Sequence, residues 1–349
     1  MTTEPTESHS PSAFRTASGR GRKLVALLPL VLIAAGGMYV AVRMATAPPP
    51  ASSAGGPGVV SGLPLDEVIS IGRQALRNNK PLVAEQTLGE GVERFPNDQQ
   101  LRLAYAESLI AVGKFEEAYE QYDRAVAVGE DRAEYRFAAG MAASQAKLLD
   151  QAEAQWLRAR ELDRSNPQYP LYLAQLQRKA GRNGDARANL VTAVQLDPNL
   201  AIGWGTLAAI ALDENHTGPA LQHVEKSIKL EPALALWRVL KAKILRRENR
   251  PREALESVLV VPEFERQTDI AVVDELAACY GMLNQPAEAA AVCLKALEAA
   301  PGNAELNYQA ALWLQRDGQK DRALTYAKQA SILGKREAKA LAESLEASN

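Results

Sequence analysis

The chain has 349 residues, of which 61 are alanine, and only 5% of its residues are aromatic. This composition argues against a β-sandwich or barrel, which is rich in Val, Ile, Thr and aromatic residues, and favours closely packed helices. Lysine and arginine (40) nearly balance aspartate and glutamate (42), so the net charge gives no reason to expect a nucleic-acid partner. Two cysteines exclude a disulfide scaffold and a cysteine-rich metal site.

The N-terminal part predicts a membrane anchor. Residues 1–23 are polar and without apolar periodicity, which predicts a disordered cytoplasmic tail. The 19 residues from Leu24 to Val42 carry no charge, and as a helix they span roughly 28 Å, close to the hydrocarbon core of a bilayer. We therefore expect a transmembrane signal-anchor helix over residues 24–43 that contacts the lipid bilayer. Four basic residues precede it and only Arg43 follows, which predicts a cytoplasmic N-terminus.

Signal cleavage is the alternative for this segment. The residues from Ala45 to Ala47 have the A-x-A form of a cleavage site, but Pro48 directly after them hinders cleavage. Gly37 and Ala41 have the small-xxx-small spacing that supports self-association through the membrane helix. Residues 44–64 carry no charge and are rich in Pro, Gly and Ser, which predicts a linker.

From Leu65 onward, small residues recur with a period of 34. They occupy the eighth, twentieth and twenty-seventh places of each unit, and these 24 places hold 19 alanines, where an even spread gives about four. One extra residue falls near residues 263–269. The predicted units are 65–98, 99–132, 133–166, 167–200, 201–234, 235–269, 270–303 and 304–337, and residues 338–349 predict a capping helix with a short tail.

The period, the small residues and the closing prolines (Pro96, Pro198, Pro232 and Pro301) resemble the tetratricopeptide repeat (TPR) family. The resemblance implies an all-α fold: a right-handed superhelical solenoid of eight helix pairs with a C-terminal capping helix, here preceded by one transmembrane helix. One pair cannot bury its apolar face alone, so neighbouring pairs must stack. The family's aromatic fourth place is kept by Trp204 in one unit only.

The resemblance also implies a concave groove that binds a protein or peptide, lined by the second, fifth, ninth, twelfth and thirteenth places of the first helices. The predicted groove begins apolar and becomes basic, which favours a partner with apolar anchors and some acidic character. The alternative is ordinary packing between repeats and a solvated basic face. The predicted groove residues are Ile69, Arg73, Leu103, Phe137, Met141, Leu171, Tyr172, Arg178, Lys179, Lys243, Arg246, Arg247 and Tyr308.

No motif for catalysis, cofactor binding or metal binding occurs, so we expect no enzyme, no cofactor and no metal site. His216 and His223 lack a third ligand, which argues for surface histidines. Cys279 and Cys293 are interpreted as buried reduced thiols, with a disulfide as the alternative. No unit has the Lys and Asn pair of the chaperone-binding carboxylate clamp.

These features together predict a non-catalytic scaffold at the bacterial inner membrane. The anchor would be single-pass, and the repeat domain would lie in the periplasm. There it would recruit a partner protein in assembly, secretion or export at the cell envelope. The alternatives are a soluble periplasmic or secreted module after signal cleavage, and a regulatory subunit of a membrane enzyme complex.

Overall fold

The computed structural model describes residues 60–347, and every regular element in this range is a helix. Alanine favours helix formation, and its small side chain allows neighbouring helices to pack closely. The helices are α2 (Leu65–Arg77), α3 (Pro81–Arg94), α4 (Gln99–Ala111), α5 (Phe115–Val128), α6 (Ala133–Gln145), α7 (Leu149–Leu162), α8 (Gln168–Lys179), α9 (Asn183–Leu196), α10 (Ala201–Asp213), α11 (Thr217–Leu230), α12 (Ala235–Arg247), α13 (Pro251–Leu259), α14 (Glu263–Thr268), α15 (Ile270–Met282), α16 (Pro286–Ala299), α17 (Ala304–Arg316), α18 (Lys320–Ile332) and α19 (Arg336–Ala347).

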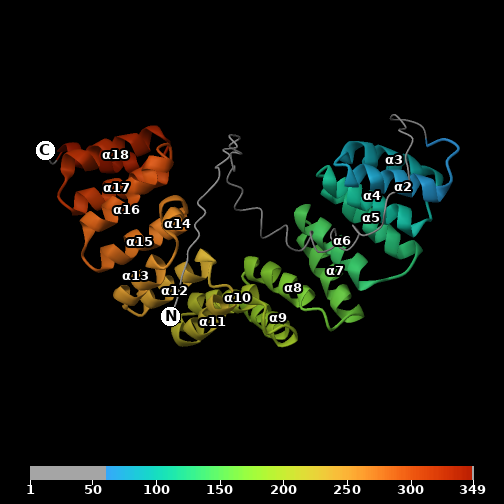
Figure 1. The fold of residues 1–349 in the computed structure, drawn as a ribbon, viewed down its shortest axis with the longest axis horizontal. Helices are drawn as coiled ribbons and strands as arrows, with labels where there is room; N and C mark the ends of the chain where they lie inside the picture. The colour runs from blue at the N-terminus through green and yellow to red at the C-terminus, as the bar shows by residue number, and fades with distance from the viewer. Residues whose placement is uncertain (1–59, 348–349) are drawn as a thin grey trace, which may run out of the picture. The chain divides into compact units, whose positions relative to one another are not determined.

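The helices pack as successive pairs, which confirms the expected all-helical solenoid for the described residues. In each pair a first helix packs against the second helix that follows it: α2 with α3, α4 with α5, and so on to α17 with α18. Each second helix also packs against the first helix of the next pair, so the pairs follow one another in chain order (Figure 1). The short α14 interrupts this order between α13 and α15, and α19 covers α18 at the C-terminal end.

The turn inside each pair repeats with the same period as the sequence. One residue per turn has a positive φ: Asn79, Gly113, Lys147, Gly181, Asn215, Asn249, Asn284 and Gly318. The next residue donates its backbone N–H to a carbonyl five residues earlier, as Lys80 does to Ala75 at 2.9 Å and Lys114 to Leu109 at 2.8 Å. This bond caps the C-terminus of the first helix, and Asn or Gly tolerates the left-handed conformation that it requires. The spacing is 34 except between Asn249 and Asn284, where the extra residue lies.

The small residues found by their period lie where helices cross. All eight alanines at the twentieth place, from Ala84 to Ala323, have 0% exposure, and the eighth and twenty-seventh places are buried as well. Close approach at these crossings leaves no room for a larger side chain. At Gly140 even a Cβ atom would come within 2.4 Å of the Trp156 indole. The small residue of α6 therefore makes space for the largest side chain of α7.

Both ends of the array are covered by local structure. Val60 is 4% exposed and Leu63 packs beside it in the core of the first pair, although both fall in the predicted linker. The Arg94 guanidinium holds this segment by donating to the carbonyl oxygens of Val60 and Leu63. At the other end, α19 buries Ala342 and Leu345 against α17 and α18. The last apolar face is thereby withdrawn from water, as a capping helix requires.

The predicted membrane localisation is corrected by the structure. Within residues 60–347, no helix is both long enough and apolar enough to cross a bilayer. The segment from Leu24 to Val42, on which the anchor prediction depended, lies outside the described residues. We therefore withdraw the prediction of a single-pass inner-membrane protein with a periplasmic repeat domain, together with the predicted lipid contact and the self-association through a membrane helix.

Candidate binding surface

The predicted groove residues all lie on the first helices of the pairs, which share one face of the array. Some consecutive first helices contact each other directly: α2 contacts α4, and α12 contacts both α10 and α15. We call the surface formed by these helices the first-helix face. The predicted residues come from six of them: α2, α4, α6, α8, α12 and α17. Their individual surroundings differ, and these differences decide which side chains are free to bind.

Two of the predicted apolar residues belong to the core. Leu103 is 5% exposed and packs between the second and third pairs, and Leu171 is 4% exposed and packs between the fourth and fifth. Ile69 is half-buried against the core of the first pair. These side chains already contribute the apolar contacts that hold neighbouring pairs together. Leu103 and Leu171 therefore offer no free surface to a partner.

Phe137, Met141 and Tyr172 form part of an aromatic cluster between the third and fourth pairs. The Phe137 ring centroid lies 5.1 Å from that of Tyr172 and 5.4 Å from that of Tyr169, and Trp156 lies 5.4 Å from Tyr172. These separations are typical of favourable aromatic pairs. Phe137, Met141 and Tyr172 keep part of their surface exposed, whereas Trp156 and Tyr169 are buried. The cluster thus presents a firm apolar edge on the first-helix face.

The basic residues gather at the C-terminal ends of α8 and α12. Arg178 and Lys179 lie in the last turn of α8, and Lys243 and Arg247 lie on α12, all four exposed. A cation at a helix C-terminus is stabilised by the helix dipole. Arg178 lies 3.6 Å from the Asp213 carboxylate of α10. Among the ion pairs formed by residues 60–347, none involves Lys179, Lys243 or Arg247.

Arg246 differs from its basic neighbours because its charge is committed within the array. Its Nε and Nη2 donate to the two carboxylate oxygens of Glu275 at 2.5 Å and 3.2 Å. The Glu275 side chain is 2% exposed and that of Arg246 is 28% exposed. This bidentate ion pair connects α12 to α15 across the joint between the sixth and seventh pairs. Arg246 is therefore a residue of that joint rather than a free basic group.

Arg73 and Tyr308, at the two ends of the predicted set, are also engaged. Arg73 donates to the Gln100 side chain at 3.3 Å. Burial raises the pKa of Glu107, and the positive charge of Arg73 partly offsets that rise. The Tyr308 ring lies 5.3 Å beneath the Lys335 ammonium, within range of a cation–π contact. Lys335 in turn pairs with Glu305 at 2.7 Å. Neither end therefore offers a free charge comparable with those of α8 and α12.

One acidic residue of the first-helix face was missed by the sequence interpretation. Asp274 occupies the fifth place of α15, and burial raises the pKa of its carboxyl group. Its Oδ1 atom is buried without a hydrogen-bond partner. The fifth place could have indicated that it lies on this face, but the sequence gives no measure of its burial.

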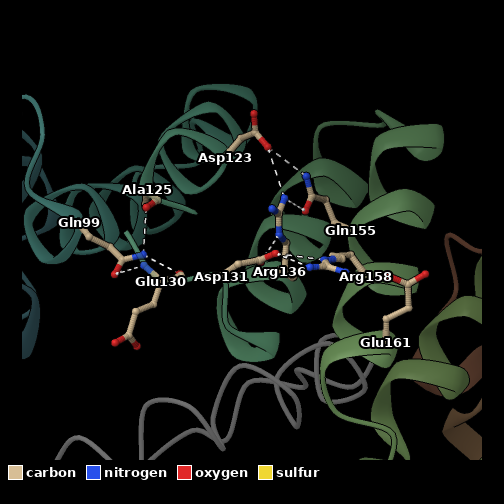
Figure 2. Close-up of polar contacts among 9 residues, drawn as sticks. All are labelled: Gln99, Asp123, Ala125, Glu130, Asp131, Arg136, Gln155, Arg158 and Glu161. Carbon is tan, nitrogen blue, oxygen red and sulfur yellow. Dashed lines mark hydrogen bonds and ion pairs between the residues drawn. The ribbon is translucent and has the colours of Figure 1, made fainter. Parts of the chain in front are cut away.

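A polar network joins the second and third pairs. The Asp131 carboxylate accepts from Arg136 at 2.6 Å and from Arg158 at 3.0 Å (Figure 2). The Gln155 side chain accepts from Arg136 at 3.0 Å and donates to Asp123 at 3.2 Å. Hydrogen bonds from Arg136 are the main cause of the lowered pKa of Asp131. Because each charged group already has its partners, we assign this network to stability rather than to binding.

The contact between Arg136 and Gln155 belongs to a recurring position, where the fourth place of a unit meets its twenty-third place. We call it the fourth-place contact. In the second unit Arg102 donates to Gln121 at 2.6 Å, so the same pair of residue types recurs. In the fifth unit Trp204 stacks on His223 with ring centroids 5.6 Å apart. The family's aromatic fourth place is thus replaced by arginine where glutamine lies opposite.

His216 and His223 lie beside one cavity, and the two cysteines lie in separate parts of the core. His216 Nδ1 lies 3.5 Å from Glu214, and both histidines line a cavity of about 130 Å³ together with apolar residues of α10. Burial, aided by the charge of Lys226, lowers the pKa of His223. Cys279 and Cys293 are both free and buried, and burial raises the pKa of each thiol to about 12. They belong to different core clusters.

Comparison with known proteins supports the repeat family at the level of the fold. The model for the N-terminal TPR repeats region of Psidin matches residues 210–331. No curated protein matches the chain. Similar solved structures include yeast Tom70, with a TM-score of 0.53 and 18% identity over 86% of this chain and 67% of that one. The APC/C hetero-tetramer Cut9-Hcn1 has a TM-score of 0.51 and 14% identity, covering 82% of this chain and 57% of that one.

A tetratricopeptide repeat protein from Parabacteroides merdae has a TM-score of 0.50 and 16% identity, with coverage of 81% and 98%. At these identities the likeness concerns the fold alone. The chain spans little more than half of the Cut9-Hcn1 chain that it matches. The Psidin model thus matches about a third of the chain, and the three structures show that the described residues share the fold of arrays of repeated helix pairs.

Proposed function

We propose that this tetratricopeptide-type array is a non-catalytic scaffold that binds a segment of a partner protein on its first-helix face. The binding part lies over α8, α10 and α12, and the segment carries acidic side chains among apolar ones. One observation supports this proposal above the others. Exposed basic side chains stand on α8 and α12, on either side of α10, whose own residues on this face are mostly small or apolar.

Three of the four charged side chains of this surface form no ion pair within the described residues, although Arg247 Nη1 donates to the carbonyl oxygen of Leu212 at 3.4 Å and to Asn215 Oδ1 at 3.5 Å. Lys179, Lys243 and Arg247 form none of the ion pairs found among residues 60–347. The pair between Arg178 and Asp213 is exposed, with side-chain exposures of 43% and 54%. Exposed pairs contribute ~1 kcal/mol or less, so a carboxylate of a partner competes with Asp213 for Arg178. An acidic segment therefore gains ion pairs here without breaking a buried contact.

The apolar part of the segment is placed by the neighbouring aromatic cluster. Phe137, Met141 and Tyr172 keep exposed surface next to α8 and offer rigid apolar anchors. One of the similar structures, Cut9-Hcn1, is a hetero-tetramer, so a repeat array of this fold is found there in an assembly with a second protein. The proposal includes neither a membrane tether nor a role in export.

The test uses the full chain and a fluorescein-labelled peptide of alternating glutamate and leucine, followed by fluorescence anisotropy. Reversing two charges, with Lys179→Glu and Lys243→Glu together, should weaken binding by about tenfold or more at low salt. Raising the salt to about 0.5 M should weaken binding to the unmodified chain, because screening acts on exposed charges.

The matched control is Lys229→Glu, an exposed lysine on the second helix α11. It makes a charge reversal of the same kind away from the first-helix face, so peptide affinity should change by less than about twofold. Affinity for a peptide of alternating lysine and leucine should not fall in the Lys179→Glu and Lys243→Glu variant. Equal loss of affinity in the control and in the double variant would refute the proposed surface.

A further inference from the structure

The repeat is broken in its sixth unit. Helix α13 ends at Leu259 after 9 residues, whereas the other second helices run for 13 or 14. Val261 turns inward and is 3% exposed, and Pro262 cannot continue the helix because it lacks a backbone N–H and restricts the residue before it. The six residues of α14 follow and pack beside α15 and α16 (Figure 1).

The break leaves large apolar side chains in water. Leu259 is 41% exposed, Val260 63% and Phe264 75%. They stand within six consecutive residues, at the end of α13 and on α14. Single exposed apolar residues are common, but a local group with an exposed phenylalanine is typical of an interaction site. We call Leu259, Val260 and Phe264 the α13–α14 patch.

The patch has an acidic surrounding. Residues 250–269 contain five acidic and three basic side chains, and one of the acids, Glu253, pairs with Arg250 at 2.6 Å. Glu256 and Glu263 are both exposed, and Glu263 lies close enough to α16 that its charge helps to raise the pKa of Lys295. Of the other two basic residues, Arg252 is exposed, whereas Arg266 has a buried Nε atom and is partly withdrawn from solvent. The field around the patch therefore favours cations and repels anions.

We infer that the α13–α14 patch is a second docking surface, which takes an amphipathic protein segment with apolar and basic side chains. The three apolar side chains give contact area, and the surrounding carboxylates select a basic segment over an acidic one. None of these residues lies on a first helix, so this surface is made of different side chains from the basic first-helix face. The two surfaces select segments of opposite charge, and the second does not depend on the function proposed for the first.

The experiment measures binding of a labelled amphipathic helical peptide made of leucine and lysine to the full chain. Phe264→Ser together with Val260→Ser should weaken binding by about tenfold, which corresponds to ~1.4 kcal/mol. Both residues are exposed, so the variant should keep its melting temperature. Glu256→Gln together with Glu263→Gln should weaken binding by about threefold at low salt and have little effect at about 0.5 M salt.

The control is Leu82→Ser, which removes an equally exposed apolar side chain (70%) from α3 in the first pair. It should leave affinity for the leucine–lysine peptide unchanged, as should Lys179→Glu with Lys243→Glu on the first-helix face. An unchanged affinity in the Phe264 and Val260 variant would overturn the inference. So would sedimentation that shows a dimer of the full chain lost in that variant, because the occupant would then be a second copy.

Discussion

Removing the Arg246 side chain should weaken the joint between the sixth and seventh pairs far more than removing an exposed lysine from the same helix. In Arg246→Ala the Glu275 carboxylate, only 2% exposed, would lose both charged hydrogen bonds that now hold it. Breaking a buried ion pair in this way costs about 3–5 kcal/mol. Because Arg246 is itself 28% exposed, water can partly replace it, and we expect the lower end, about 3 kcal/mol.

The assay is urea unfolding followed by circular dichroism, combined with hydrogen exchange of α12 and α15. Repeat arrays can unfold in parts, so local exchange shows whether the loss lies at this joint. Lys243→Ala, an exposed residue of the same helix, should change stability by no more than about 0.5 kcal/mol. Adding Glu275→Gln to Arg246→Ala should restore part of the loss, because it removes the uncompensated buried charge.

The reasoning fails if Arg246→Ala and Lys243→Ala destabilise the chain equally. It also fails if Glu275→Gln adds to the loss instead of relieving it. Either result would mean that the pair is not formed or that its carboxylate is solvated. Arg246 would then again be a free basic group of the first-helix face, as the sequence interpretation held.

Three further predictions concern packing and titration. Gly140→Ala should destabilise the array by about 1–3 kcal/mol in thermal melts, because its Cβ would meet the indole of Trp156. Gly184→Ala is the control: its Cβ would have no atom within 4 Å, so the melting temperature should stay unchanged or rise slightly. Burial raises the pKa of Cys279 and of Cys293 to about 12, so both thiols should resist a thiol reagent in the folded chain at pH 8. Both should react once urea unfolds the chain. Fast labelling of the folded chain would contradict this. The pKa of His223 in the folded chain lies below its unfolded value of 6.5, so the unfolded chain binds the proton more readily and stability should fall from pH 7 to pH 5. The His223→Phe variant should show a smaller fall. An unaltered pH profile in that variant would refute the assignment.

The period of small residues was sufficient to predict the helix crossings. Ala118, Ala186 and Ala220 are fully buried because a crossing in a repeated pair has the same geometry each time, so one alanine predicts the next. The place that breaks this pattern, Val261, is also where α13 has already ended. A misfit in the sequence thus marked an irregular joint, although nothing in the sequence showed that α14 would leave Phe264 exposed.

The binding surface was harder to predict because the same place in a unit serves two purposes. Leu103, Phe137 and Leu171 all occupy the fifth place, yet only Phe137 keeps exposed surface. Whether such a residue faces a partner or the next pair depends on the size of its neighbours, which one sequence does not give. Arg246 was misassigned for the same reason, since its partner Glu275 lies 29 residues further along the chain.

The fourth-place contacts also affect how the chain avoids wrong pairings. Crossings built mostly from alanine have similar shapes, so sterics alone separate few of the possible pairings; the crossing of Gly140 with Trp156 is an exception. The side chains at the fourth-place contacts differ between units, so they can distinguish a correct pairing of helices from a wrong one. Pairing α4 with α7 would still set Arg102 against Gln155, but pairing α10 with α7 would set Trp204 against that glutamine. Arg238 of α12 also holds a fourth-place arginine, so α4, α6 and α12 could each set an arginine against Gln121 or Gln155. Between the second and third units the distinction is steric, because α7 needs the glycine at position 140 to accommodate Trp156, whereas α4 has Ala106 at that place.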